Sequence, residues 1–83
     1  MMEIKILGSG CQRCEALEKM TRKAVEELKL KASIEKVGDI EEILSYSVMR
    51  TPALLINEKL MFSGEVPRMS ELKSLLYSVS LLA

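Results

Sequence analysis

The sequence has no histidine and no tryptophan, and its only aromatic residues are Tyr46, Phe62 and Tyr77. Three aromatic side chains are too few for a platform on which nucleic-acid bases could stack. No segment approaches the roughly 18 consecutive apolar residues of a membrane-spanning helix. The chain has 12 basic and 12 acidic residues, so no overall charge attracts nucleic acid or anionic lipid. We therefore expect neither a nucleic acid nor a membrane as partner.

Cysteine is also scarce, because Cys11 and Cys14 are the only two in the chain. A secreted domain of this size stabilised by disulfides usually carries about four to eight cysteines in distant pairs. A bridge between Cys11 and Cys14 would close a very short loop, which constrains the unfolded chain little. Residues 1–7 are too short and too mixed in character for a signal peptide. The pair is better explained by reactivity than by stability, and we expect a cytoplasmic protein.

The length of 83 residues is enough for one domain and too short for two, so we expect a single domain over residues 1–83. Alternating or short apolar runs predict strands at 3–7, 32–37, 53–56 and 60–62. Apolar residues at helical spacing predict helices over about 11–28, from Asp39 to the stop at Thr51-Pro52, and after Pro67. The order β-α-β-α-β-β-α implies a parallel first pair and an antiparallel last pair. The predicted fold class is α/β, with a four-stranded mixed sheet and flanking helices.

The same patterns predict which side chains are buried. The first helix has an apolar stripe, and the second helix has another that follows a capping box formed by Asp39 and Glu42. Asn57-Glu58 is expected to turn the last two strands into a hairpin, although glycine is preferred at the position of Glu58. The residues expected in the core include Leu17, Met20, Ala24, Leu28, Ile40, Ile43, Leu44, Val48, Met49, Met61, Leu72, Leu76 and Val79.

The chemistry is expected at Cys11-Gln12-Arg13-Cys14, which follows a strand and the glycine-rich segment 8–10 and begins a helix. The unpaired N–H groups and the positive dipole end of a helix N-terminus favour a thiolate at Cys11. Cys14 lies one turn later, where its sulfur would be nearby and more buried. This arrangement predicts a redox-active dithiol in which Cys11 attacks and Cys14 resolves.

Other uses of the two cysteines stay open at this point. A structural zinc ion takes four protein ligands, so zinc or an iron–sulfur cluster would need carboxylates or a second chain. A Cu(I) or other soft-metal carrier also places two such cysteines between a strand and a helix. That class of carrier has methionine two residues before its first cysteine, where this chain has Ser9, and it ends in a strand. An inert buried pair is the remaining alternative.

Three blocks of the sequence carry a family resemblance. They are residues 6–14 followed by Leu17, residues 48–54, and Ser63-Gly64 followed by Val66-Pro67. In this order and spacing they resemble the small thioredoxin-like or glutaredoxin-like redox-active disulfide proteins of archaea and bacteria. The resemblance implies a thioredoxin-like fold and a thiol–disulfide oxidoreductase that acts as a protein disulfide reductase or electron relay. It also implies a redox-active Cys11–Cys14 disulfide without metal or other cofactor, a disulfide-containing client protein and an electron-donating reductase. We expect a monomer.

The resemblance further implies a cis bond between Thr51 and Pro52, facing the cysteines. The backbone of Thr51 would then pair with the substrate chain, and Pro52 would keep metals away from the dithiol. Gly10 and Gly64 are expected beside the bound substrate.

The sequence departs from the family pattern at several positions. Gln12-Arg13 replaces the usual Gly-Pro or Pro-Tyr, and Gly10 stands where thioredoxins carry tryptophan. Lys5 replaces a buried aspartate that accepts a proton, so proton transfer at Cys14 is expected to rely on water. Lys5 itself is expected to be solvated or paired with Glu3. Arg13 either lowers the pKa of a cysteine or points into water. The missing glycine before Gly64 makes glutathione a poor substrate, so the chain is predicted to be neither a standard thioredoxin nor a glutathione-dependent glutaredoxin.

Overall fold

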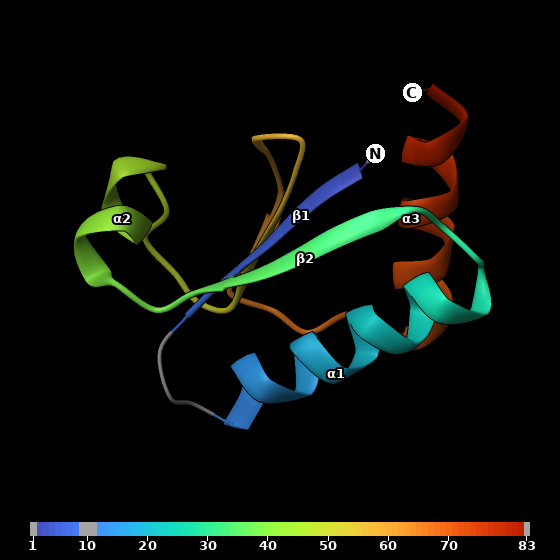
Figure 1. Ribbon diagram of the computed structural model, residues 1–83. Helices are drawn as coiled ribbons and strands as arrows, with labels where there is room; N and C mark the ends of the chain where they lie inside the picture. Colours follow the sequence, from blue (N-terminus) through green and yellow to red (C-terminus); the bar gives the residue numbers. More distant parts are fainter. Residues whose placement is uncertain (1, 9–11, 83) are drawn as a thin grey trace.

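The computed structural model describes residues 2–8 and 12–82, and it has the predicted order of strands and helices (Figure 1). The elements are β1 (Met2–Leu7), α1 (Gln12–Glu27), β2 (Ala32–Val37), α2 (Ile40–Ser45), β3 (Ala53–Ile56), β4 (Lys59–Ser63) and α3 (Met69–Leu82). The strands form one sheet in the order β2-β1-β3-β4. β1 pairs parallel with β2, whereas β3 is antiparallel to both β1 and β4. The prediction of a mixed four-stranded α/β fold is therefore confirmed.

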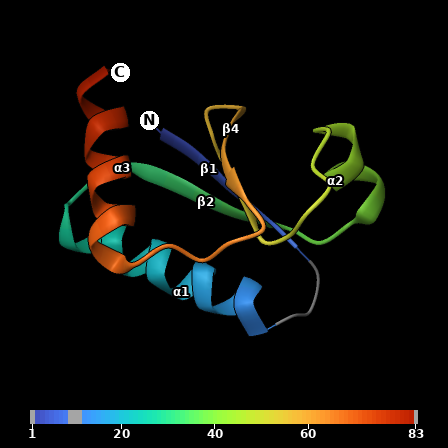
Figure 2. The same ribbon diagram turned by 180° about the vertical axis from the view of Figure 1, so that it is seen from behind.

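The helices are distributed unequally around the sheet. α1 and α3 pack side by side over one face, while α2 lies beyond one end of the strands (Figures 1 and 2). The core under α1 and α3 is formed by Met2, Ile4, Ile6, Leu17, Ala24, Leu54, Ile56, Leu72 and Leu76. A second cluster, on the side of α2, is formed by Leu7, Val37, Ile43, Val48, Ala53 and Leu55. β3 contributes to both clusters, which explains why it is a continuous apolar run.

α1 follows its prediction closely, since Leu17 and Ala24 are buried and Met20 and Leu28 pack partly buried against the core. The sequence pattern did not identify Thr21, which is also fully buried. Its hydroxyl donates a hydrogen bond of 2.7 Å to the carbonyl of Leu17, one turn earlier. Because this bond satisfies the hydroxyl within the helix, threonine can occupy a core position.

α2 was predicted with too large a buried face. Ile43 and Val48 are buried, but Ile40 is 64% exposed and Leu44 is 56% exposed. The helix has only six residues and lies at the end of the sheet, so one narrow side of it meets the core. Asp39 does cap it, and its carboxylate accepts a 3.1 Å bond from the N–H of Glu41. Within residues 2–8 and 12–82, Glu42 makes no return bond to Asp39, so the capping-box prediction is wrong.

The hairpin between β3 and β4 turns at Asn57 and Glu58, as predicted. Both residues have positive φ, 51° and 69°, which a two-residue hairpin turn of type I′ requires at both positions. The side-chain oxygen of Asn57 accepts a 2.9 Å bond from the backbone N–H of Glu3, and the backbone N–H of Asn57 donates a 2.7 Å bond to the Glu3 carbonyl. These bonds fix the turn against β1. β4 extends one residue beyond the predicted strand at each end.

α3 begins at Met69, two residues after Pro67. The Glu71 carboxylate accepts a 3.0 Å bond from the N–H of Arg68 and so satisfies one donor at the helix start. Leu72 and Leu76 are fully buried, as predicted. No helix among the described residues is both long and apolar enough to cross a membrane.

Candidate functional site

Cys14 lies in the first turn of α1 and is completely buried. It is disulfide-bonded and therefore does not titrate. Its burial agrees with the prediction for the resolving cysteine. The other two predicted residues of this segment, Gly10 and Cys11, lie outside the described residues.

Gly8 provides the space for the sulfur of Cys14. A Cβ atom on Gly8 would lie 2.3 Å from Cys14 Sγ and 3.2 Å from Cys14 Cβ, far inside normal contact distance. The N–H of Gly8 donates a 2.9 Å bond to the carbonyl of Val37, which fixes the end of β1 against β2. The sequence pattern identified Gly8 only as part of a strand break, so its contact with Cys14 was missed.

Thr51 and Pro52 approach the same position from the segment before β3. Their peptide bond is cis, as the resemblance implied. Thr51 Cβ lies 3.6 Å from the position that a Cβ on Gly8 would occupy, so Gly8 has Cys14 and Thr51 as neighbours. Thr51 is exposed, whereas Pro52 is buried. The end of β1, the start of α1 and the segment before β3 thus meet at Gly8.

Gly64, which directly follows β4, uses both of its backbone polar groups in hydrogen bonds near the site. Its N–H donates a 2.8 Å bond to the carbonyl of Pro52, and its own carbonyl accepts a 2.8 Å bond from Arg13 Nη2. Arg13 therefore joins the start of α1 to the segment after β4. From the sequence, Arg13 was expected either to lower the pKa of a cysteine or to point into water. Neither alternative includes the bond to Gly64, because no local pattern relates Arg13 to a residue so far along the chain.

Lys5 does not act as the proton acceptor that the resemblance places at its position, because its amine is engaged in two hydrogen bonds. Its Nζ donates to Tyr46 Oη at 2.7 Å and to Glu58 Oε1 at 2.8 Å, so the predicted pairing with Glu3 is wrong. The hydrogen bond with Glu58, followed by that with Tyr46, raises the pKa of Lys5. The same bond with Lys5 lowers the pKa of Glu58. Lys5 is a fixed cation that joins β1, the end of α2 and the hairpin turn, and it cannot accept a proton near neutral pH.

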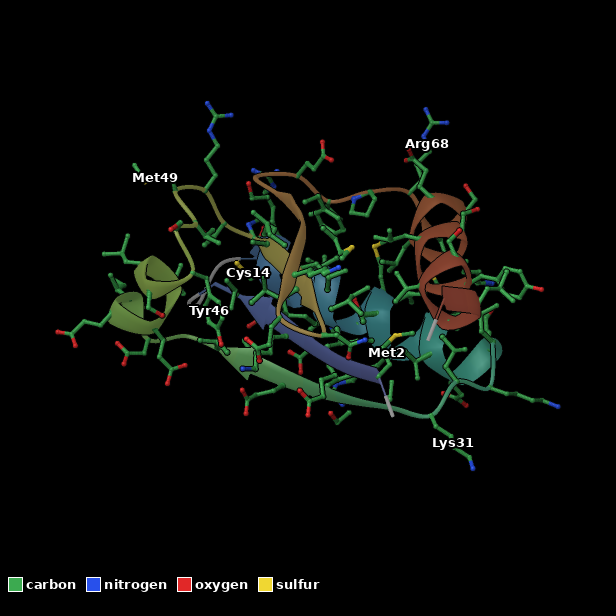
Figure 3. All side chains as sticks on the ribbon, turned by 90° about the horizontal axis from the view of Figure 1, so that it is seen from above. Met2, Cys14, Lys31, Tyr46, Met49 and Arg68 are labelled. Atoms are coloured by element: carbon green, nitrogen blue, oxygen red, sulfur yellow. The ribbon has the colours of Figure 1, made fainter. Side chains whose placement is uncertain are left out.

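Met49 lies at the surface near the site, although the sequence pattern placed it in the core. It is 87% exposed and points outward from the segment between α2 and β3 (Figure 3). Val48 takes the buried position in that segment, which leaves the next residue facing solvent.

Among the described residues, those gathered around Cys14 belong to no metal-binding cluster and do not line the cavity beside α3. Within residues 2–8 and 12–82, no three histidine, cysteine or acidic side chains gather to hold a metal ion. A cavity of about 460 Å³ lies between the hairpin and α3, and its lining includes Ile56, Met61, Leu75 and Val79. None of the residues around Cys14 lines that cavity.

Comparisons with known proteins agree on the family. The thioredoxin domain family matches residues 2–77. A thioredoxin of Methanothermobacter thermautotrophicus is 38% identical over 76 residues, which cover 92% of this chain and 99% of that protein. A thioredoxin of Methanocaldococcus jannaschii is 38% identical over 78 residues, covering 94% of this chain and 90% of that protein. The crystal structure of Deadhead, a germline-specific thioredoxin of Drosophila melanogaster, superimposes with a TM-score of 0.65 at 15% identity. The superposition covers 94% of this chain and 80% of that one, and it bears on the fold alone.

Proposed function

This chain belongs to the thioredoxin family of thiol–disulfide oxidoreductases, and from this premise we propose that Cys11 and Cys14 are the exchanging pair. The observation that carries the proposal is the position of Cys14. It is disulfide-bonded in the first turn of α1, against the bare backbone of Gly8. Cys11 is the only other cysteine in the sequence.

The proposed reaction moves two electrons from the dithiol to a client disulfide. The Cys11 thiolate attacks one client sulfur, forms a mixed disulfide and releases the other client sulfur as a thiolate. Cys14 then loses its proton and attacks the sulfur of Cys11, which releases the second client sulfur and leaves a Cys11–Cys14 bridge. An electron-donating reductase returns the two electrons, so the cycle needs no metal and no other cofactor.

The proton of Cys14 is proposed to leave through water. The residue at the position of the thioredoxin aspartate is Lys5, which is kept charged by its bonds to Glu58 and Tyr46. A protonated amine has no acceptor site. Lys5 therefore does not serve as the base, and water accepts the proton of Cys14 instead.

We propose that the client docks along Thr51, an exposed residue whose backbone would pair with an extended client segment. Gly10 and Gly64 would flank that segment, with Pro52 beneath it. The client is a protein with an accessible disulfide, and residues 1–83 act as one cytoplasmic, monomeric domain.

Reduction of insulin disulfides by dithiothreitol tests this function. The wild-type chain should accelerate the reaction, and both Cys11→Ser and Cys14→Ser should abolish the acceleration. Lys31→Gln, an exposed change at the far end of the molecule, is the matched control and should stay active (Figure 3). A chain that purifies from reducing buffer with stoichiometric Cu(I) and no reductase activity would instead be a metal carrier.

A further inference from the structure

Gly64 lies between two arginine side chains that come from different parts of the chain. Arg13 donates to its carbonyl, and the aliphatic part of Arg50 covers its Cα. A Cβ on Gly64 would lie 3.0 Å from Arg50 Cδ and 3.1 Å from Arg50 Cβ. The φ of Gly64 is +79°, a conformation that glycine adopts at little cost. The absence of a side chain at this position therefore lets Arg13 and Arg50 share one patch of surface.

The positive charge of this arginine pair is not neutralised within the described part of the chain. Neither Arg13 nor Arg50 belongs to an ion pair there, and both are exposed. Glu65 follows Gly64 in the sequence, but it also forms no ion pair with either arginine among the described residues. The carbonyl that accepts from Arg13 is neutral, so the bond orients the guanidinium without cancelling its charge. Two positive groups thus remain available to an anion in solution.

The position of the pair relates it to the client. Gly64 is hydrogen-bonded to Pro52, which directly follows Thr51, the residue proposed to pair with the client backbone. An extended client chain advances about 3.3 Å per residue, so the client residues next to the one that pairs with Thr51 are those closest to the patch. A guanidinium presents five N–H donors in a planar fork, and a carboxylate accepts two of them at once. Because its bond to Gly64 already restricts Arg13, this side chain loses less conformational entropy on binding a carboxylate than a freely moving arginine would.

We propose that Arg13 and Arg50 recognise an aspartate or glutamate beside the reactive cysteine of the client, so that the preferred substrate is a disulfide with an acidic neighbour. This inference rests on the proposed function, since it requires a client docked along Thr51. It concerns the choice of client and leaves the exchange chemistry unchanged.

Three short peptides test the proposal. They carry the same cysteine as a 2-thiopyridyl disulfide and differ only in one neighbouring residue, which is Asp, Asn or Lys. The release of thiopyridone measures the second-order rate constant for attack by the reduced protein. Each exposed ion pair is expected to contribute about 1.5- to 5-fold, so with both arginines engaged the Asp peptide should react about 2- to 25-fold faster than the Asn peptide at low salt. The ratio should fall toward 1 near about 0.5 M salt, where exposed charges are screened.

The double variant Arg13→Gln/Arg50→Gln should bring the Asp-to-Asn ratio close to 1, and Arg50→Gln alone should lower it in part. Lys31→Gln/Lys59→Gln removes the same charge from two exposed positions outside the site and should keep the wild-type ratio. A change in cysteine reactivity alters the rates of all three peptides together, so the ratio isolates recognition. A wild-type ratio near 1, or a ratio that survives in Arg13→Gln/Arg50→Gln, overturns this inference while the proposed function stands. A wild-type protein that reacts with none of the peptides contradicts the proposed function itself.

Discussion

The contact between Gly8 and Cys14 gives a prediction that connects packing with redox behaviour. In Gly8→Ala the new methyl group would lie 2.3 Å from Cys14 Sγ, whereas roughly 3.5 Å is the closest comfortable separation of such atoms. The sulfur is disulfide-bonded and Cys14 is completely buried, so neither atom can move aside freely. Overpacking of this kind costs about 1–3 kcal/mol. The φ of +154° at Gly8 adds about 1 kcal/mol for a residue with a side chain.

The two redox forms should respond differently to this substitution. We expect a loss of about 2–4 kcal/mol in the free energy of unfolding of the oxidised form. In the reduced form the released sulfur can rotate away from the methyl group, so the loss should be smaller by about 1–2 kcal/mol. A larger loss in the oxidised form favours reduction. The reduction potential should therefore rise by about 20–45 mV, since 30 mV corresponds to about 1.4 kcal/mol for two electrons.

Urea unfolding measures the free energy of unfolding of the oxidised and reduced forms. Equilibration in glutathione buffers measures the reduction potential. Gly64→Ala is the matched control, because its cost arises from a φ of +79° and from Arg50 and involves no sulfur. It should destabilise both redox forms equally and leave the potential unchanged. Equal losses in the two forms of Gly8→Ala, or an unchanged potential, would refute the packing argument.

Two further predictions concern stability. The pKa of Glu58 is lowered in the folded state by Lys5, so the carboxylate stabilises the fold above its ordinary pKa of about 4.5, and this contribution is lost as pH falls through the lowered value. Wild type should exceed Glu58→Gln in thermal stability at pH 7, and the difference should shrink as the pH falls below about 4.5; a difference that grows on acidification would contradict this. Ile43→Ala should cost about 2–4 kcal/mol by removing a buried side chain, whereas Leu44→Ala, 56% exposed, should stay within about 0.5 kcal/mol in urea unfolding; similar losses would refute the assignment of the α2 face.

Local sequence signals were sufficient for most of the fold. The alternation at Ile4 and Ile6 and the cap at Asp39 each depend on neighbouring residues, and both predictions are confirmed. The predicted stop of the second helix at Thr51-Pro52 is wrong, because α2 already ends at Ser45. The errors at Ile40 and Leu44 have one cause. A periodic pattern identifies an apolar face, but it cannot indicate whether another element covers that face.

The site was predictable in its cysteine motif and much less so in its supporting contacts. The Arg13–Gly64 and Lys5–Glu58 bonds join residues more than about 50 positions apart, and such pairs leave no local pattern in one sequence. Gly8 had one usable signal, because it ends a strand just before the cysteine motif. A close approach of backbone to side chain is a common reason for glycine at such a position.

The assignment of roles to Cys11 and Cys14 is tested most directly by trapping the mixed disulfide. Each single cysteine-to-serine variant is reduced, mixed with a disulfide-containing client and analysed by non-reducing mass spectrometry after acid quenching. Cys14→Ser should accumulate a covalent complex through Cys11, because the resolving thiol is missing. Cys11→Ser should not, because Cys14 is completely buried. Equal trapping by the two variants, or trapping only through Cys14, would contradict the proposed mechanism.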